Sequence, residues 1–162
     1  MTTFARRVLI AAVVLALSAV TGGCGERMAE QIGGEIVDGQ VEIDDDSISI
    51  TDDEGNEFEA GGGAQIPASW PSDVPVFPSG DVVLATSQSD GTATALWETA
   101  ATAEAAADEY DALLVGQGFA MDEDSTVAGA IIRSYTGELH SVNVTVARID
   151  GMTSLTVAVV PR

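Results

Sequence analysis

Few residues in this chain combine a reactive side chain with a spacing that could support chemistry. Its 162 residues include one cysteine, Cys24, one histidine, His140, and 26 acidic residues, with no lysine. A single histidine cannot assemble a histidine-based metal site, so we expect His140 to be a surface residue beside a turn. The sequence contains no G-x-S-x-G, phosphate-binding loop or H-E-x-x-H motif. We therefore predict no enzyme activity, no cofactor and no metal site.

Carboxylates are the only abundant reactive group. With 26 of them, some pair must lie close together, so a carboxylate-based hydrolase stays an alternative that no particular pair supports. The runs at residues 44–46 and 52–54 offer oxygen ligands to calcium, but consecutive acids cannot all face one ion. We interpret both runs as solvated turns, with specific cation binding as the alternative. A net charge of −20 repels phosphates, so no nucleic-acid partner is expected.

The N-terminal sequence resembles the signal peptide of a bacterial lipoprotein. An apolar run at residues 8–20 is shorter than the roughly 20 residues that span a bilayer, as in a signal peptide. Small residues then lead to Cys24 as in a lipobox, although Thr21 stands where Leu or Val is usual. We predict a signal peptide at residues 1–23 and lipidation of Cys24 with acyl chains such as palmitate. The exported protein would be anchored to the outer side of the cytoplasmic membrane; secretion with cleavage after residues 16–18 is the alternative.

Two segments separate this anchor from the rest of the chain. Residues 24–65 are acidic with short alternating pieces, so we predict a lipid-anchored spacer, either disordered or with one or two weak β-hairpins. Residues 66–80 contain four prolines, which exclude a helix or a central strand. We predict an extended proline-rich segment that packs on the following domain through Trp70, Val74, Val76 and Phe77. An exposed aromatic ligand for a partner is the alternative.

The proline-rich segment also carries a resemblance to a known family. Its sequence, IPASWPSDVPVFPSG, resembles a phrase found in small exported bacterial lipoproteins of uncharacterised function. The stretch DEYDALLVGQGF, residues 108–119, is more loosely similar. In that family the phrase introduces a compact α+β domain, so the resemblance implies such a domain here and carries no mechanism.

Residues 81–162 are predicted to form this α+β domain. An apolar stripe at helical spacing over residues 99–115 includes Tyr110, which we expect in the core. Asp150 and Gly151 predict a tight hairpin turn. We predict a small antiparallel sheet with one amphipathic helix packed on one face, in the order β-β-α-β-β-β. The strands are expected at residues 82–87, 92–98, 128–135, 141–149 and 154–160, with a short one at 119–121.

These features together predict a non-enzymatic binding or interaction module of the bacterial cell envelope, tethered to the membrane through Cys24, with an envelope protein as its partner. Arg133 and Arg148 are expected in structural ion pairs, with an anionic ligand as the alternative. A small-molecule or cation-binding lipoprotein is the alternative function. The sequence does not specify the oligomeric state. The residues predicted for an interaction surface are Trp70, Phe77 and Trp97.

Overall fold

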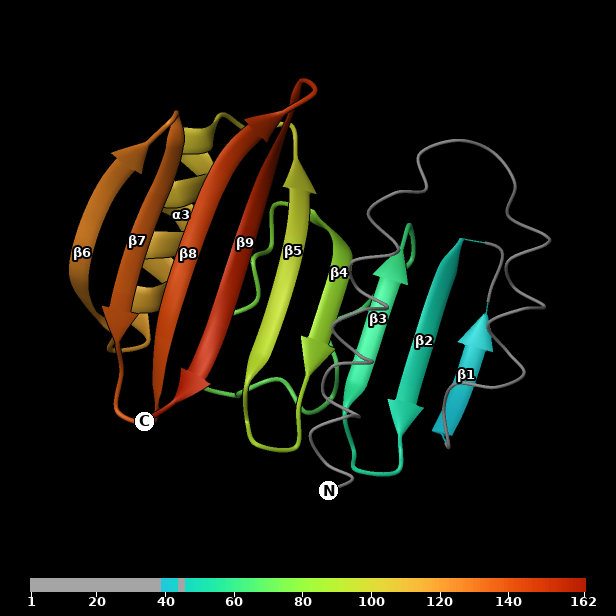
Figure 1. Cartoon of the computed structure of the whole chain (residues 1–162). Coiled ribbons are helices and arrows are strands. Elements are labelled where there is room, and N and C mark those ends of the chain that lie inside the picture. The colour runs from blue at the N-terminus through green and yellow to red at the C-terminus, as the bar shows by residue number, and fades with distance from the viewer. Residues whose placement is uncertain (1–38, 44–45) are drawn as a thin grey trace. The chain divides into compact units, whose positions relative to one another are not determined.

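The computed structural model describes residues 39–43 and 46–162, and these form nine strands and one helix (Figure 1). The predicted signal peptide at residues 1–23, the lipidation site Cys24, and Asp44 and Asp45 of the first acidic run lie outside the described residues. The helix is α3 (Ala103–Gly116). The strands are β1 (Gly39–Ile43), β2 (Ser47–Asp52), β3 (Glu57–Gly61), β4 (Asp81–Ser87), β5 (Ala93–Thr99), β6 (Ala120–Val127), β7 (Ala130–Thr136), β8 (His140–Ile149) and β9 (Met152–Pro161).

All nine strands pair into one antiparallel sheet, in the order β1-β2-β3-β4-β5-β9-β8-β7-β6. The chain meanders from β1 to β5, crosses through α3 to the far edge at β6, and returns strand by strand until β9 pairs with β5. Helix α3 contacts β6, β7, β8 and β9 and lies behind them in Figure 1. The predicted α+β class is confirmed. The predicted order and the small sheet are wrong, because five strands precede the helix and four follow it.

The sheet begins well before residue 81, where we expected the domain to start. Strand β3 pairs with β4, and β2 and β1 continue the sheet beyond it. Each of these three strands is only five or six residues long, and isolated hairpins of that size are marginal in water. From local alternation alone, residues 24–65 are predicted to form at most weak hairpins. In the structure β3 pairs with the edge of β4, so the described part of this segment belongs to the sheet.

Helix α3 begins later than the predicted start at residue 99, because Thr99 ends β5 and Thr102 caps the helix. The Thr102 hydroxyl accepts a hydrogen bond from the N–H of Ala105 at 3.2 Å, which satisfies one of the free donors of the first turn. The predicted apolar stripe is confirmed as the buried face of the helix, which consists of Ala106, Ala107, Tyr110 and Leu114.

The helix ends in a Schellman motif. The N–H of Phe119 donates to the carbonyl of Leu114, and the N–H of Gly118 donates to that of Val115, both at 3.0 Å. Gly118 has a φ of +92°, which glycine adopts without steric cost. Phe119 and Leu114 both belong to the core cluster, which supplies the apolar contact that accompanies this motif.

Two turns in the second half of the chain differ in how clearly the sequence signals them. Asp150 and Gly151 have φ of +50° and +93° and join β8 to β9, so the predicted hairpin is confirmed. Ala128 and Gly129 have φ of +51° and +85°, but alanine rarely adopts such values, and the sequence predicts a strand there. Strand β6 is also longer than the predicted piece at 119–121. It continues through the acidic residues that follow, which are suited to an exposed edge strand.

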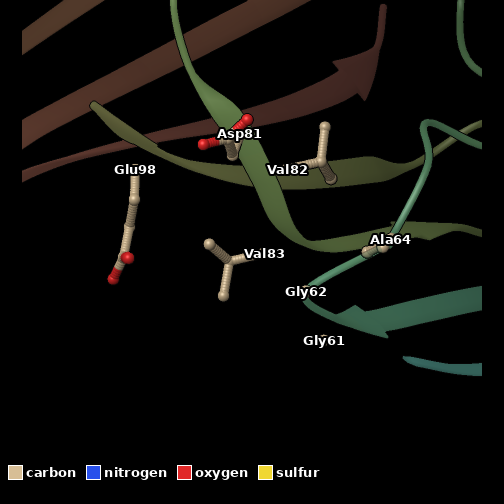
Figure 2. A pocket seen from close by; sticks show the side chains of 8 residues that line it. Gly61, Gly62, Ala64, Asp81, Val82, Val83 and Glu98 are labelled. Carbon is tan, nitrogen blue, oxygen red and sulfur yellow. The ribbon is translucent and has the colours of Figure 1, made fainter. Parts of the chain in front are cut away.

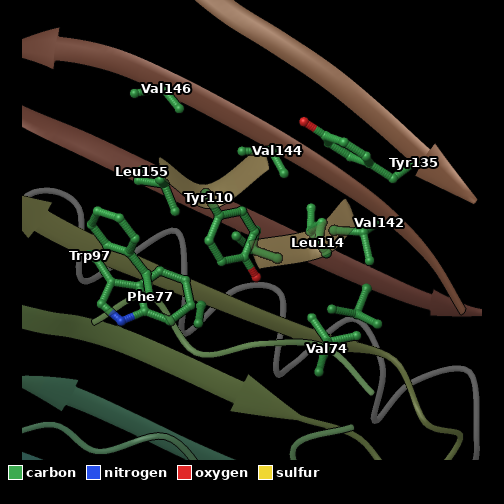
Figure 3. Packing of buried hydrophobic residues seen from close by; sticks show 14 of the residues in the cluster. Val74, Phe77, Trp97, Tyr110, Leu114, Tyr135, Val142, Val144, Val146 and Leu155 are labelled. Carbon is green, nitrogen blue, oxygen red and sulfur yellow. The ribbon is translucent and has the colours of Figure 1, made fainter. Parts of the chain in front are cut away.

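The core lies between one face of the sheet, helix α3 and the proline-rich segment (Figure 3). Trp97 on β5 is fully buried at its centre. The ring centroids of Trp70 and Phe77 lie 6.2 and 6.3 Å from that of Trp97, both edge-on, and Phe77 makes a further edge-on contact with Tyr110 at 6.1 Å. Each such pair contributes about 0.5–1.5 kcal/mol beyond the burial of its area. The four rings therefore join three segments that are far apart in the sequence.

The interaction surface predicted at Trp70, Phe77 and Trp97 is not found, because these side chains are only 9%, 1% and 0% exposed. Aromatic residues are characteristic of cores and of interfaces, so residue type alone does not separate the two. The proline-rich segment also differs from the extended form that we expected. The N–H of Trp70 donates to the carbonyl of Pro67, and the N–H of Val74 to that of Pro71, in two successive turns.

Two valines of the proline-rich segment provide a matched test of this core. Val74 is 3% exposed and Val76 is 47% exposed. We expect Val74→Ala to lower the free energy of unfolding by about 2 kcal/mol, since it removes buried methyl groups and leaves a cavity. We expect Val76→Ala to change it by less than about 0.5 kcal/mol. Equal effects of the two substitutions in urea unfolding would contradict the packing of this segment on the sheet.

Candidate functional site

We expected the single histidine, His140, to be a surface residue, but the structure gives it a carboxylate partner. Its Nδ1 lies 2.9 Å from a carboxylate oxygen of Asp73, and both side chains are partly buried. This contact joins β8 to the proline-rich segment across 67 residues of chain. His140 therefore has a partner in the proline-rich segment.

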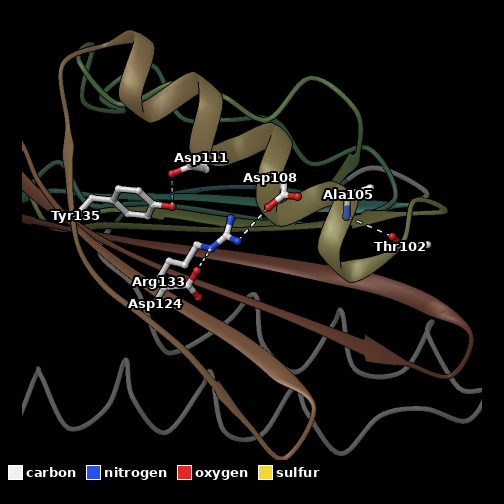
Figure 4. Close-up of polar contacts among 7 residues, drawn as sticks. All are labelled: Thr102, Ala105, Asp108, Asp111, Asp124, Arg133 and Tyr135. Carbon is white, nitrogen blue, oxygen red and sulfur yellow. Dashed lines mark hydrogen bonds and ion pairs between the residues drawn. The ribbon is translucent and has the colours of Figure 1, made fainter.

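Arg133 has the structural ion pairs that the sequence predicts (Figure 4). Its guanidinium contacts Asp108 of α3 at 3.0 Å and Asp124 of β6 at 3.3 Å, so it ties β7 to both elements. Burial lowers the pKa of Arg133, but the hydrogen bond to Asp108 and the charge of Asp124 more than offset it, and the pKa lies above its usual value. Arg148 instead donates to the carbonyl of Gly151 at 2.9 Å.

The two tyrosines of the chain are both buried and hydrogen-bonded in the core. Tyr110 donates to the carbonyl of Pro75 at 2.8 Å, and Tyr135 donates to a carboxylate oxygen of Asp111 at 3.0 Å (Figure 4). Burial raises the pKa of both hydroxyls, and the Asp111 carboxylate raises that of Tyr135 further. Both phenols thus act as neutral donors and are not poised for acid–base chemistry at neutral pH.

The second acidic run forms the turn between β2 and β3. The Asp52 carboxylate accepts hydrogen bonds from the backbone N–H groups of Glu54 and Asn56, both at 2.9 Å, and from the Asn56 side-chain amide at 2.7 Å. Such side-chain bonds stabilise turns. Within the described residues, no three side chains of His, Cys, Asp or Glu are grouped so that they could hold a metal ion.

An open depression of about 430 Å³ lies beside the start of β4. Its lining includes the backbone of residues 61–63 and the side chains of Asp81 and Glu98, which are directly opposite each other in the sheet. Figure 2 shows the two carboxylates pointing in different directions. A small-molecule site needs a concave surface with convergent polar groups, and this depression does not supply them.

The remaining candidate is the sheet face opposite α3, which we call the outer face. Its residues follow from the register, because Ala85 and Ser87 are buried on the α3 side and alternate residues of a strand point to opposite faces. One row across the sheet is Ile43, Ile48, Ala60, Leu84, Leu96, Thr156, Thr145 and Ile132. The next row is Val41, Ile50, Phe58, Thr86, Thr94, Ala158, Asn143 and Ser134, and it ends at Glu123 on the edge strand β6.

From β1 to β7 neither row contains a charged residue, although 20% of the chain is charged. Along β7, β8 and β9 the outer face is formed mainly by Thr, Ser, Asn and Ala. Along β1 to β5 it is mainly apolar, and we call this part the apolar half. It consists of Val41, Ile43, Ile48, Ile50, Phe58, Leu84 and Leu96, of which Ile43 is exposed and the others are partly exposed.

The predicted site residues and the observed candidate surface therefore do not coincide. Trp70, Phe77 and Trp97 lie in the core, and Cys24 lies outside the described residues. The apolar half was not predicted, although alternation at residues 41–43 and 48–50 indicates which of its residues share a face. What the sequence lacks is a signal that these strands join the same sheet as β4.

Comparison of the chain with family models, with curated proteins and with solved structures finds no match. Among the described residues, no helix is both long and apolar enough to cross a membrane. The resemblance of the proline-rich segment to exported lipoproteins thus stays a prediction.

The buried tyrosines allow a test of the fold at alkaline pH. Because the folded state raises the pKa of both phenols above the ordinary value near 10, their contribution to stability is present below pH 10. It is lost as the pH rises through the folded-state values. We expect tyrosinate absorbance to stay low in the native protein at pH 10 and to rise together with unfolding, whereas in urea both residues ionise near pH 10.

The variant Tyr135→Phe leaves Tyr110 as the only phenol and assigns the signal. Native-state ionisation of either tyrosine with its ordinary midpoint, while the circular dichroism stays unchanged, would contradict the buried hydrogen bonds described above.

Proposed function

We propose that this chain is an exported lipoprotein anchored to the cell membrane through Cys24, and that its α+β domain is a non-enzymatic interaction module. The outer face is the binding surface in this proposal. The observation that carries it is the lack of charge in two rows of the outer face from β1 to β7 within a chain of net charge −20. Depletion of charge at the centre of a surface is characteristic of protein interfaces.

The arrangement of the core supports this choice of face. The residues that cover the sheet, in α3 and in the proline-rich segment, contact its inner face through Trp70, Val74, Phe77 and Tyr110. Helix α3, the helix that the structure describes, contacts β6 to β9, and the buried core cluster lies on the same side of the sheet. An antiparallel sheet commonly has one covered and one free face, but a free face is then usually polar, and the apolar half is not.

The N-terminal sequence supports the anchor. An apolar stretch of signal-peptide length ends in small residues and the only cysteine of the chain. Two or three acyl chains on Cys24 would hold the protein stably at a membrane. Tethering would raise the local concentration of the domain near its partner, which is how a module without catalytic groups can act.

The anchor is tested by the mass and location of the mature protein. We expect the mature N-terminus to be Cys24 with attached acyl chains and the protein to be in the membrane fraction. We expect Cys24→Ser to remove the acyl mass and to release the protein from that fraction or leave it uncleaved. An unmodified Cys24, or a mature chain that starts at residue 19, would contradict the proposal.

The binding surface is tested by photo-crosslinking in cells. A photoreactive benzoylphenylalanine is placed at Thr156, near the middle of the outer face, or at Val115, which is 54% exposed on α3. We expect a reproducible adduct from position 156 and none from position 115. Adducts of equal yield at both positions, or none at either, would contradict the outer face as the interaction surface.

A further inference from the structure

In β1, β2 and β3 the apolar side chains lie on the opposite face from those of the central strands of the sheet. In β5, β8 and β9 the apolar side chains, such as Trp97 and Leu155, face α3 and the core. In β2 and β3 the apolar side chains Ile50 and Phe58 lie on the outer face, because they are paired in register with Thr86. The α3 side of the same strands carries Glu57 and Glu59.

This inversion indicates that β1, β2 and β3 are built to bury the outer face. A strand of alternating polarity normally packs its apolar side against another layer. The inner layer offers these strands little apolar surface, since α3 contacts β6 to β9 and the proline-rich segment meets β3 through a polar contact, from the Ser69 hydroxyl to the Glu57 carboxylate. The layer that they require must therefore lie on the other side of the sheet.

We propose that a second copy of this chain supplies that layer. Two copies would pack their outer faces against each other about a two-fold axis, with apolar half against apolar half. This inference deepens the proposed function, and rests on it, by naming the partner of the outer face.

The distribution of charge favours a second copy over an unlike partner. An acidic protein that binds an unlike protein gains from opposite charges across the interface, but from β1 to β5 the two rows of the outer face offer no carboxylate to a basic partner. Two copies of net charge −20 repel each other in most orientations. A two-fold contact through the apolar half places each apolar patch against its own equivalent and keeps the carboxylates of Glu57 and Glu59, on the opposite face, away from the contact.

The size of the apolar half suits a weak contact. Strands spaced about 4.8 Å apart, with a rise of about 3.3 Å per residue, give its five strands of about five residues an area of roughly 400 Å². A standard stable interface buries about 800 Å² per partner. The small side chains of Thr156, Ala158 and Thr145 beside the apolar half would let the two sheets approach at the usual spacing of about 10 Å.

The test uses the full chain in the cell, expressed as two copies with different tags. Ile43 and Glu42 are neighbours on β1, both exposed, and point to opposite faces. Photoreactive benzoylphenylalanine at position 43 is expected to give an adduct that carries both tags. The same probe at position 42 is expected to give at least about tenfold less of the two-tag adduct. A tenfold ratio corresponds to a difference of about 1.4 kcal/mol in favour of the contact through the outer face.

A second variant tests the chemistry of the contact. Phe58→Glu is combined with the probe at position 43, and Val115→Glu, on α3, serves as the control with the same change in charge. We expect Phe58→Glu to reduce the two-tag adduct about tenfold or more, because two buried carboxylates would face each other. Val115→Glu is expected to leave it unchanged. Retention of the native tyrosine titration shows that each variant is folded. If Phe58→Glu does not fold, the comparison of the probes at positions 43 and 42 tests the pairing of two copies by itself.

The outcomes separate this inference from the proposed function. An adduct from position 43 that never carries the second tag overturns the pairing of two copies but leaves the outer face as an interaction surface. Equal two-tag adducts from positions 43 and 42 also overturn it, since they indicate random encounters. If neither position 43 nor Thr156 gives any adduct, both proposals fail.

Discussion

The packing of four aromatic rings around Trp97 is the interaction on which the rest of the structure depends. Trp97 is on β5, Trp70 and Phe77 come from the proline-rich segment, and Tyr110 comes from α3. These contacts fix which face of the sheet is covered, because the segment and the helix must both approach β5 from the same side. The hydrogen bond from Tyr110 to the carbonyl of Pro75 joins the two covering elements to each other. Once the rings are packed, the opposite face of all nine strands is the one left to contact something else.

The extent of the cover explains why the two ends of the sheet differ. Nine strands extend over about 43 Å, and helix α3 lies behind the sheet and runs along the strands, so it covers only part of that width (Figure 1). Helix α3 contacts β6 to β9, and the proline-rich segment covers β5 and β4 through Trp70 and Phe77. The proline-rich segment meets the inner side of β3 through a polar group, the Ser69 hydroxyl at Glu57, so apolar side chains on the inner side of β1, β2 and β3 would lack an apolar layer. Their sequence instead places Glu57 and Glu59 on that side and Phe58 on the other. The apolar side chains of these strands therefore lie on the outer face.

Local sequence predicts the elements of this fold better than their assembly. Alternation and helical spacing locate α3 and most strands after residue 81, and Asp150–Gly151 marks its turn, because these signals depend only on neighbours in the chain. The turn at Ala128–Gly129 is missed because alanine has no preference for positive φ. The pairing of β3 with β4 is missed because it joins residues with no local signal for each other. For the same reason, alternation places Trp97 on a face with Ala93 and Ala95 but does not indicate that this face is buried. The predicted interaction surface therefore included Trp97, which lies on the inner side of the sheet.

Membrane anchoring and self-association would reinforce each other in a protein of this kind. A chain of net charge −20 resists association in dilute solution, because repulsion between like charges acts over about 8–10 Å at moderate salt. Two copies held on one membrane meet at an effective concentration that can reach roughly the millimolar range, where an interface worth only about 4 kcal/mol is half occupied. The apolar half is modest in size and is flanked by small polar residues, as suits a contact of that strength. Such a protein would pair where it is anchored and would stay soluble during export, since the same surface is too weak to drive association of the free chain.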